Sequence, residues 1–315
     1  MALRKIIVGI DVSKDRLDVF LSGEGSRFEV ANDTAGLAAL MDRLEGLVIT
    51  AVALEASGGY ERRAVRRLAE AGLPVRRLDP MRVRRFAQAG GRWAKNDRID
   101  AQTIADFAAA FDGEAVKRNP KRERLAEYVA YRRQLGQQLT AVRHQAHLLA
   151  APELVAISRR RIADLKAMIA RLGRRIAVAV REDEAFRQTN DILRSVKGIG
   201  PVVAATLIAE FPELGTLTRR QAAALLGVAP YDRDSGKKKG KRSIFGGRAD
   251  TRAAFYMAAL AAARFNPDIK AFHQRLKAAG KKPKVATTAC MRKLIVTLNA
   301  LVRDNRSWTP QHPST

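Results

Sequence analysis

The chain has 315 residues, which is enough for two or three domains with their own hydrophobic cores. It carries 58 Lys and Arg against 32 Asp and Glu, a net charge of +26 that favours nucleic acid as partner over a membrane surface. Its single cysteine excludes an internal disulfide and fits a reducing cytoplasm. The sequence has no run of eighteen apolar residues, so no membrane-spanning segment is expected.

Residues 1–112 are predicted to form an α/β domain. Short β-branched or alternating apolar runs predict strands at 6–8, 17–21, 27–30, 49–54 and 74–78. Helices are expected after Asn32 and after Tyr60, where apolar residues recur at helical spacing.

Four acids stand at points that such a domain could bring together. Asp11 follows the first strand, Glu55 follows the strand at 49–54, and Asp97 and Asp100 share one face at the start of a helical pattern. Clustered carboxylates need cation charge between them, so this set suits a two-metal phosphoryl-transfer site.

The alternative is that each acid has a separate structural role. Asp11 would then start a turn, Glu55 would pair with Arg62 or Arg63, and Asp97 would cap a helix. We interpret four nearby acids as surface charges or caps, namely Asp15, Asp18, Asp33 and Asp79.

Arginines interleave with aromatic residues just before the last two acids. Arg82, Arg84, Arg85 and Arg92 surround Phe86 and Trp93, a pattern that suits a nucleic-acid surface, although solvated arginines on a helix face are commoner.

Residues 113–189 are predicted to be a helical linker domain. Apolar residues at near-heptad spacing from Leu125 to Leu149, resuming at Leu154 after Pro152, predict two antiparallel helices in a coiled-coil hairpin. The stripe, which includes Leu135 and Leu139, either joins protomers, which we favour, or packs on its own domain.

Residues 190–315 are predicted to form a mainly helical domain. Residues 196–204 follow a helix-hairpin-helix pattern, whose glycines would let backbone N–H groups approach a phosphate; a plain tight turn is the alternative. Thr218 and Gln221 predict a capping box for a helix that ends at Gly227. Further helices are expected at 251–263, and at 285–302 with Cys290 packed inside, and the tail after Ser307 is expected to be disordered.

The stretch from Tyr231 to Ser243 is rich in lysine and glycine and predicts either a flexible linker or a loop that orders on phosphate. Ser235 lies among cations that would ease ionisation of its hydroxyl. The residues expected to contact nucleic acid are Arg84, Arg85, Arg92, Lys95, Lys197, Gly198, Gly200, Lys237, Lys238, Lys239, Lys241 and Arg242.

Several motifs together resemble the DEDD transposases of the insertion-sequence-110 family. They are Gly-Ile-Asp-Val-Ser-Lys at 9–14, Leu-Glu-Ala-Ser-Gly at 54–58, Lys-Asn-Asp-Arg-Ile-Asp-Ala at 95–101, and Gly-Val-Ala-Pro at 227–230 followed by Ser-Gly at 235–236. The resemblance implies an RNase H-type domain like that of the junction resolvase RuvC, a coiled-coil linker and a C-terminal transposase domain.

The resemblance also implies site roles and partners. Asp11, Glu55, Asp97 and Asp100 would hold Mg²⁺, and a C-terminal serine would attack DNA. Ser235 matches that serine, although Asp234 precedes it where many relatives carry a second small hydroxyl, and Ser243 is another hydroxyl in the loop. Donor and target DNA would be chosen by a structured bridge RNA.

The sequence therefore predicts a cytoplasmic, nucleoid-associated transposase that acts as a homo-oligomer, a dimer or a tetramer on DNA. It would cleave and exchange DNA strands with Mg²⁺ through a phosphoserine intermediate. One alternative is a junction resolvase in which the acids activate water, and another is a non-catalytic architectural DNA binder. A plain nuclease has no need of residues 230–248, and an architectural protein has no need of the four acids.

Overall fold

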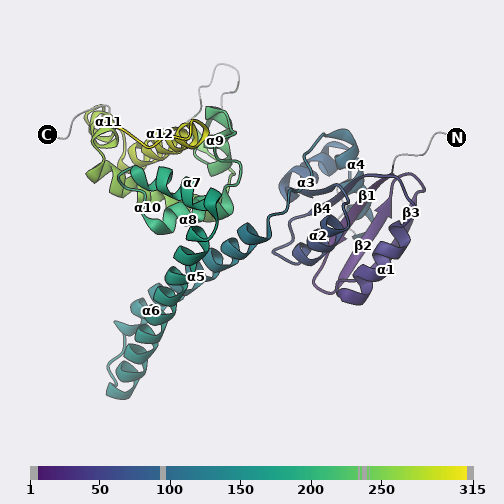
Figure 1. The fold of residues 1–315 in the computed structure, drawn as a ribbon, viewed down its shortest axis with the longest axis horizontal. Coiled ribbons are helices and arrows are strands. Elements are labelled where there is room, and N and C mark those ends of the chain that lie inside the picture. The colour runs from purple at the N-terminus through teal and green to yellow at the C-terminus, as the bar shows by residue number, and fades with distance from the viewer. Residues whose placement is uncertain (1–5, 93–96, 233–234, 236–239, 241, 311–315) are drawn as a thin grey trace. The chain divides into compact units, whose positions relative to one another are not determined.

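The computed structural model describes residues 6–92, 97–232, 235, 240 and 242–310, without the side chains of residues 97–99. Its internal contacts divide the chain into two compact units (Figure 1): unit 1, Met1–Arg118, and unit 2, Asn119–Thr315. Residues 113–118 belong to unit 1. The N–H of Val116 donates to the carbonyl of Val75 at 2.7 Å, and Arg118 pairs with Glu70 at 2.6 Å. The predicted division into three domains stays a prediction.

Unit 1 is built on a five-stranded mixed sheet, which confirms the predicted α/β class. The strands are β1 (Ile6–Val12), β2 (Arg16–Leu21), β3 (Ser26–Ala31), β4 (Ile49–Glu55) and β5 (Val75–Leu78), in the order β3-β2-β1-β4-β5. β2 pairs antiparallel with β1 and β3, whereas β4 pairs parallel with β1 and β5. All five predicted strands are present.

Two helices cover each face of this sheet. On one face, α1 (Thr34–Leu44) and α2 (Glu61–Glu70) bury Leu40 and Leu68 against the even-numbered residues of β1. On the other face lie α3 (Pro80–Ala89) and α4 (Asp97–Ala110), with Ile104 against Ala53 of β4. Because strand residues alternate between faces, the odd-numbered residues of β1 face α4.

Side-chain caps fix where two of these helices begin. Asp33 accepts from the N–H of Gly36 at 2.8 Å to start α1, and Asp79 accepts from the N–H of Met81 at 2.8 Å to start α3. The interpretation of Asp33 and Asp79 as caps is therefore confirmed.

Unit 2 begins with the predicted pair of long helices, α5 (Pro120–Ala146) and α6 (Pro152–Arg181), which extends away from the other helices of the unit (Figure 1). At its base, Leu125 and Ile176 join the main core of the unit, while Leu135 and Leu165 form a smaller core further out. Leu135 is 3% exposed and Leu139 packs beside it, so both hold α5 against α6.

Six more helices and a short hairpin complete unit 2 within the described residues. They are α7 (Glu184–Ser195), α8 (Pro201–Glu210), α9 (Arg219–Leu226), β6 (Pro230–Tyr231), β7 (Ser243–Ile244), α10 (Ala249–Phe265), α11 (Pro267–Ala278) and α12 (Pro283–Arg303). The predicted capping box of α9 is confirmed, and Gly227 ends the helix in the left-handed conformation with φ 77°. Helix α11 was not among the predicted elements.

By length and composition alone, helix α12 could cross a bilayer. It is the one helix among the described residues that meets both criteria. Half of its apolar window is buried, and Cys290, Leu294 and Leu298 pack in the core of unit 2, so we interpret it as a core helix. Burial raises the pKa of the Cys290 thiol to about 11, which agrees with its predicted packing role.

The expected disorder after Ser307 is wrong at Trp308. The backbone N–H of Trp308 donates to Ser195 Oγ at 2.8 Å, and its side chain packs against the main core. A large aromatic side chain gains enough from such burial to hold a short tail in place.

Candidate functional site

Asp11 and Glu55 lie at the ends of the two central parallel strands, on the same face of the sheet. Gly9 pairs with Ala53 in the register of β1 and β4, and each acid follows two residues later in its strand. Because strand residues two apart share a face, both carboxylates point to the side that α4 covers. Both residues are half-buried.

Gly9 brings α4 unusually close to this edge of the sheet. A Cβ atom on Gly9 would lie 2.1 Å from the carbonyl oxygen of Ala101 and 2.7 Å from the backbone N of Ala105. Asp100, also half-buried, directly precedes Ala101, and α4 begins at Asp97. The close contact therefore fixes the first turns of α4 next to the strand that carries Asp11.

A further acid belongs to this face. Asp18 of β2 lies directly opposite Asp11, and Glu29 of β3 lies directly opposite Asp18. Arg16 separates these charges on one side, since its Nε is 3.0 Å from Asp18 Oδ2 and its Nη1 is 3.6 Å from Glu29. Asp18 was predicted to be a surface charge or a cap, because antiparallel register cannot be read from the sequence.

The loop after Glu55 is held by a buried carboxylate. Glu61, which is 3% exposed, accepts from the N–H groups of Ser57 at 3.1 Å and Gly59 at 2.8 Å. These bonds fix the chain directly after β4 and so the position from which Glu55 projects.

The donor chemistry of this edge fits a hard divalent cation, because carboxylate oxygens are the ligands that Mg²⁺ prefers. Among the residues that the structure describes, no three His, Cys, Asp or Glu side chains form a ready-made metal group, and the side chain of Asp97 is outside that set. Asp11, Glu55 and Asp100 would hold the ion, with Asp97 at the start of α4 as the fourth predicted ligand.

The predicted serine loop is carried by the β6–β7 hairpin. Pro230 pairs with Ile244 and Tyr231 with Ser243. Ser235 is exposed and forms an isolated β-bridge beyond β6, whereas Ser243 is half-buried within β7. Residues 233–234, 236–239 and 241, which include the predicted contacts Lys237, Lys238, Lys239 and Lys241, are outside the described residues.

An ion pair anchors the end of this hairpin to the helices. Arg248 reaches Glu213 through two bonds, Nη1 to Oε2 at 2.8 Å and Nη2 to Oε1 at 2.6 Å, and it also donates to the carbonyl of Glu210 at 2.7 Å. Burial raises the pKa of Glu213, but the hydrogen bonds and charge of Arg248 outweigh burial and the pKa is lowered overall.

The basic residues near α3 are only partly available to a ligand. Arg84 and Arg85 are exposed, but Arg92 donates to Thr103 at 3.0 Å and pairs with Asp106 at 2.8 Å, so it links the end of α3 to α4. Phe86 packs edge-on against Phe107, with ring centres 5.6 Å apart, within the core under α3. Trp93 and Lys95 lie outside the described residues.

In the predicted helix-hairpin-helix segment, Lys197 and Gly200 are exposed between α7 and α8. Gly198 has φ 106°, and a Cβ there would lie 2.6 Å from the Cβ of Ala262. Glycine is therefore required at position 198 because the chain packs closely against α10 there, as in a tight turn between helices. Arg242, also in the predicted set, pairs with Asp232 at 2.5 Å on the surface of the β6–β7 hairpin.

Acids at the ends of the two central strands thus lie on the face of the mixed sheet that α4 covers, which defines an α/β domain with acids gathered at one edge of its sheet. Two family models match this chain: one described as "Transposase", of the DEDD type of IS110 elements, over residues 8–150, and one described as "Transposase IS116/IS110/IS902 family" over residues 190–274. The chain belongs to this IS110/IS116 family of DEDD transposases, as its motifs predicted.

Curated relatives come from insertion elements. The chain is 29% identical over 161 residues to the uncharacterized 44.8 kDa protein of IS116 from Streptomyces clavuligerus, an alignment covering 49% of this chain and 40% of that protein. It is 30% identical over 141 residues to the uncharacterized 42 kDa protein of IS900 from Mycobacterium paratuberculosis, covering 42% of this chain and 34% of that protein. The chain thus aligns with less than half of the length of either relative.

Among solved structures, the one titled "T. thermophilus RuvC in complex with Holliday junction substrate" matches over 36% of this chain and 99% of that chain, with 17% identity and a TM-score of 0.28.

Proposed function

We propose that this protein cleaves and exchanges DNA strands with Mg²⁺ held by Asp11, Glu55, Asp97 and Asp100. Two observations together carry this proposal: the register of β1 with β4, and the close contact of α4 with Gly9. They direct the strand-end acids to one face, beside the start of α4. A bound divalent ion would stabilise charge that develops on a DNA phosphate as a strand is cut.

Ser235 is the proposed nucleophile. Its hydroxyl would attack a backbone phosphorus, forming an Oγ–P bond as one P–O bond of the strand breaks. The serine proton would pass to a base, and the departing sugar oxygen would take up a proton. Support comes from the exposure of Ser235 at the end of a hairpin in which Ser243 is half-buried. Rejoining to a second strand would reverse these events.

The test of this function is to stop the reaction with denaturant and map protein–DNA adducts by mass spectrometry. We expect an adduct on Ser235 that is absent in Ser235→Ala, with Ser243→Ala as the matched control. An adduct on Ser243 would show that Ser243, and not Ser235, is the nucleophile. Mg²⁺-dependent cleavage by Ser235→Ala without any adduct would instead favour a nuclease that activates water, and no metal-dependent cleavage at all would favour an architectural DNA binder.

We also propose a structured guide RNA, with donor and target DNA, as partners, and a homo-oligomer, a dimer or a tetramer on DNA, as the active form in the cytoplasm at the nucleoid. The net charge of +26 supports polyanionic partners. Sequencing the nucleic acid that copurifies with the protein tests the RNA: a discrete structured RNA supports it, and random fragments contradict it.

The hairpin of α5 and α6 is the proposed contact between protomers. Leu148 at its tip is 86% exposed and Ile157 near the start of α6 is 64% exposed. Large apolar side chains exposed together on a narrow element are typical of contact surfaces.

A further inference from the structure

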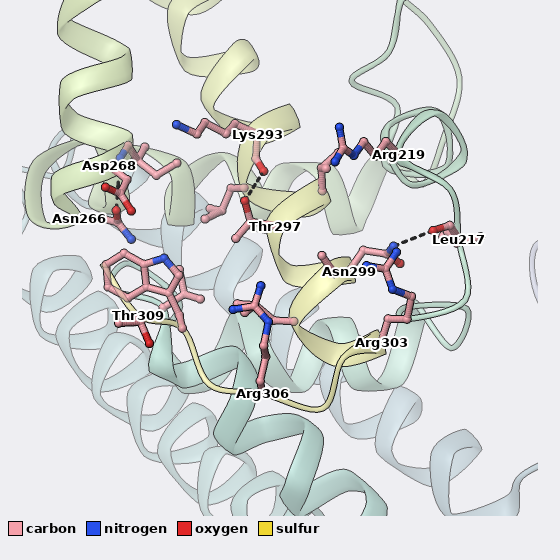
Figure 2. Close-up of a pocket in the computed structure, with 17 residues that line it drawn as sticks. Leu217, Arg219, Asn266, Asp268, Lys293, Thr297, Asn299, Arg303, Arg306 and Thr309 are labelled. Atoms are coloured by element: carbon pink, nitrogen blue, oxygen red, sulfur yellow. Dashed lines mark hydrogen bonds between the residues drawn. The ribbon is translucent and has the colours of Figure 1, made fainter. Parts of the chain in front are cut away.

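Unit 2 contains a cavity of about 300 Å³ that none of the predicted site residues lines. Figure 2 shows it bounded by α12, with Thr297 and Asn299 on that helix, and by Asn266 and Asp268 at the start of α11. Arg219 at the start of α9 and the segment after α12 also line it.

Specific contacts fold that segment back. Asn305 has φ 47°, a left-handed conformation that asparagine tolerates better than most residues, and its Oδ1 accepts from Gln188 Nε2 at 2.9 Å. The N–H of Arg306 donates to the carbonyl of Leu301 at 3.1 Å, and Trp308 is bound to Ser195 as described above. The wall is therefore a defined part of the fold, and a half-buried indole lines it.

The cavity is strongly cationic. Four exposed basic side chains line it, namely Arg219, Lys293, Arg303 and Arg306. Asp304 holds two of them by their Nε atoms, Arg303 at 2.9 Å and Arg306 at 3.5 Å. Bonds to Nε leave the terminal Nη groups of both guanidinium groups directed elsewhere, and Figure 2 shows Arg306 pointing into the cavity.

Asp268 is the acid that lines this cavity, and it lies in the first turn of α11, away from Arg219. The cavity thus has a basic side, an aromatic surface and a polar end at Asn266 and Asp268. Its volume is at the lower end of the range for small-ligand sites, about 300–1,000 Å³, which suits one nucleotide and excludes a duplex.

We infer that this cavity binds a single unpaired nucleotide of a nucleic-acid strand, with the phosphate on Arg303 and Arg306 and the base against Trp308. Unpaired bases stack on aromatic side chains, while arginines bind the adjoining phosphates. DNA and RNA share this chemistry. The inference rests on the proposed function only in taking nucleic acid as the ligand.

The test uses the fluorescence of Trp308 as a local probe. The chain has two tryptophans, so Trp93→Phe leaves Trp308 as the only one, and binding elsewhere on this basic protein goes unseen. The probes are single-stranded DNA and RNA octamers, the DNA duplex of equal length, and an octamer of abasic sites. We expect saturable quenching by one or both single strands, and little quenching by the duplex or the abasic strand.

Arg306→Gln in that background should weaken single-strand binding about tenfold and lower the salt slope by about one unit, because one phosphate contact is lost. Arg220→Gln is the matched control, since Arg220 is exposed on α9 and does not line the cavity. Equal quenching by abasic and intact strands would overturn the inference in favour of a plain anion site. Equal effects of the two variants, equal quenching by duplex, or no quenching would overturn it as well.

This experiment is separable from the proposed cleavage, because the acids of unit 1 are intact in every variant. Cleavage is measured in the wild-type protein. Quenching of the Trp93→Phe protein without cleavage by the wild type would contradict the proposed function alone, and cleavage by the wild type without quenching would contradict this inference alone.

Discussion

Asp18 lies directly opposite Asp11 across the antiparallel pair of β1 and β2. Directly opposite residues have Cβ atoms only about 4.5–5.5 Å apart, and like charges at that distance are destabilising. Arg16 offsets the charge of Asp18 from one side, at 3.0 Å, and a metal ion at Asp11 would offset it from the other. Asp18 is therefore placed to raise the affinity of the site for a cation.

The first prediction concerns this pair. Asp18→Asn should raise the Mg²⁺ concentration that gives half-maximal cleavage about 10–100-fold, as is typical when a residue behind the metal ligands is changed. Cleavage rates over a Mg²⁺ titration measure it. Asp15→Asn, an exposed acid between the same strands, is the control and should match the wild type. An unchanged Mg²⁺ requirement in Asp18→Asn would show that Asp18 has no part in the site.

The second prediction concerns the contact of β1 with α4. Gly9→Ala would place a Cβ 2.1 Å from the Ala101 carbonyl, so α4 must shift, and we expect a loss of about 1–3 kcal/mol in the free energy of unfolding. Gly136→Ala is the matched control in α5, where a new Cβ would meet nothing within 4 Å. It should leave stability unchanged or raise it by up to about 1 kcal/mol. Urea denaturation followed by circular dichroism measures both, and equal stability of the two variants would contradict the close contact.

The third prediction separates two roles for the hairpin. Leu148→Asp with Ile157→Asp should dissociate the oligomer and leave the hairpin folded, because both side chains are exposed in the single chain. Leu135→Asp should instead destabilise the hairpin itself, because it buries a charge between α5 and α6. Light scattering gives the mass and circular dichroism the helix content. An unchanged mass in the tip variant would remove the hairpin tip as the contact.

The fourth prediction concerns the ion pair of Glu213 with Arg248. The pKa of Glu213 is lowered from 4.5 in the folded state, so its stabilising contribution is present above that pH and is lost as the pH falls through the lowered pKa. Glu213→Gln should therefore destabilise the protein near neutral pH by about 1 kcal/mol, a modest figure because solvent screens a partly exposed pair. The difference from wild type should vanish in acid.

Thermal unfolding at several pH values measures that difference. Glu184→Gln is the control, because Glu184 pairs with Arg187 on the open surface of α7. A difference that grows as the pH falls would contradict the assigned direction of the pKa.

The elements of unit 1 could be predicted because their local patterns agree with their tertiary roles. Leu17, Val19 and Leu21 alternate in the sequence and all three face the core under α1 and α2. Asp33 and Asp79 likewise predict where the helices that they cap begin. Local chemistry of this kind needs no knowledge of distant segments.

What the sequence missed depends on pairing between distant segments. Asp18 joins the site only through antiparallel register, and Trp308 is ordered only because Ser195 and the core of unit 2 receive it. From the sequence alone, Leu135 could pack between protomers or inside the hairpin. The structure shows it packed against Leu165 of α6 in the same chain. The cationic cavity likewise draws its lining from α9, α11, α12 and the tail.

The acids of unit 1 are tested most directly by Mg²⁺-dependent DNA cleavage in Asp11→Asn, measured beside Asp42→Asn, an exposed acid on α1 across the sheet. Loss of one carboxylate ligand should abolish cleavage by Asp11→Asn while DNA binding and folding stay near wild type, and Asp42→Asn should cleave normally. Wild-type cleavage rates in Asp11→Asn at every Mg²⁺ concentration would contradict the proposed metal site.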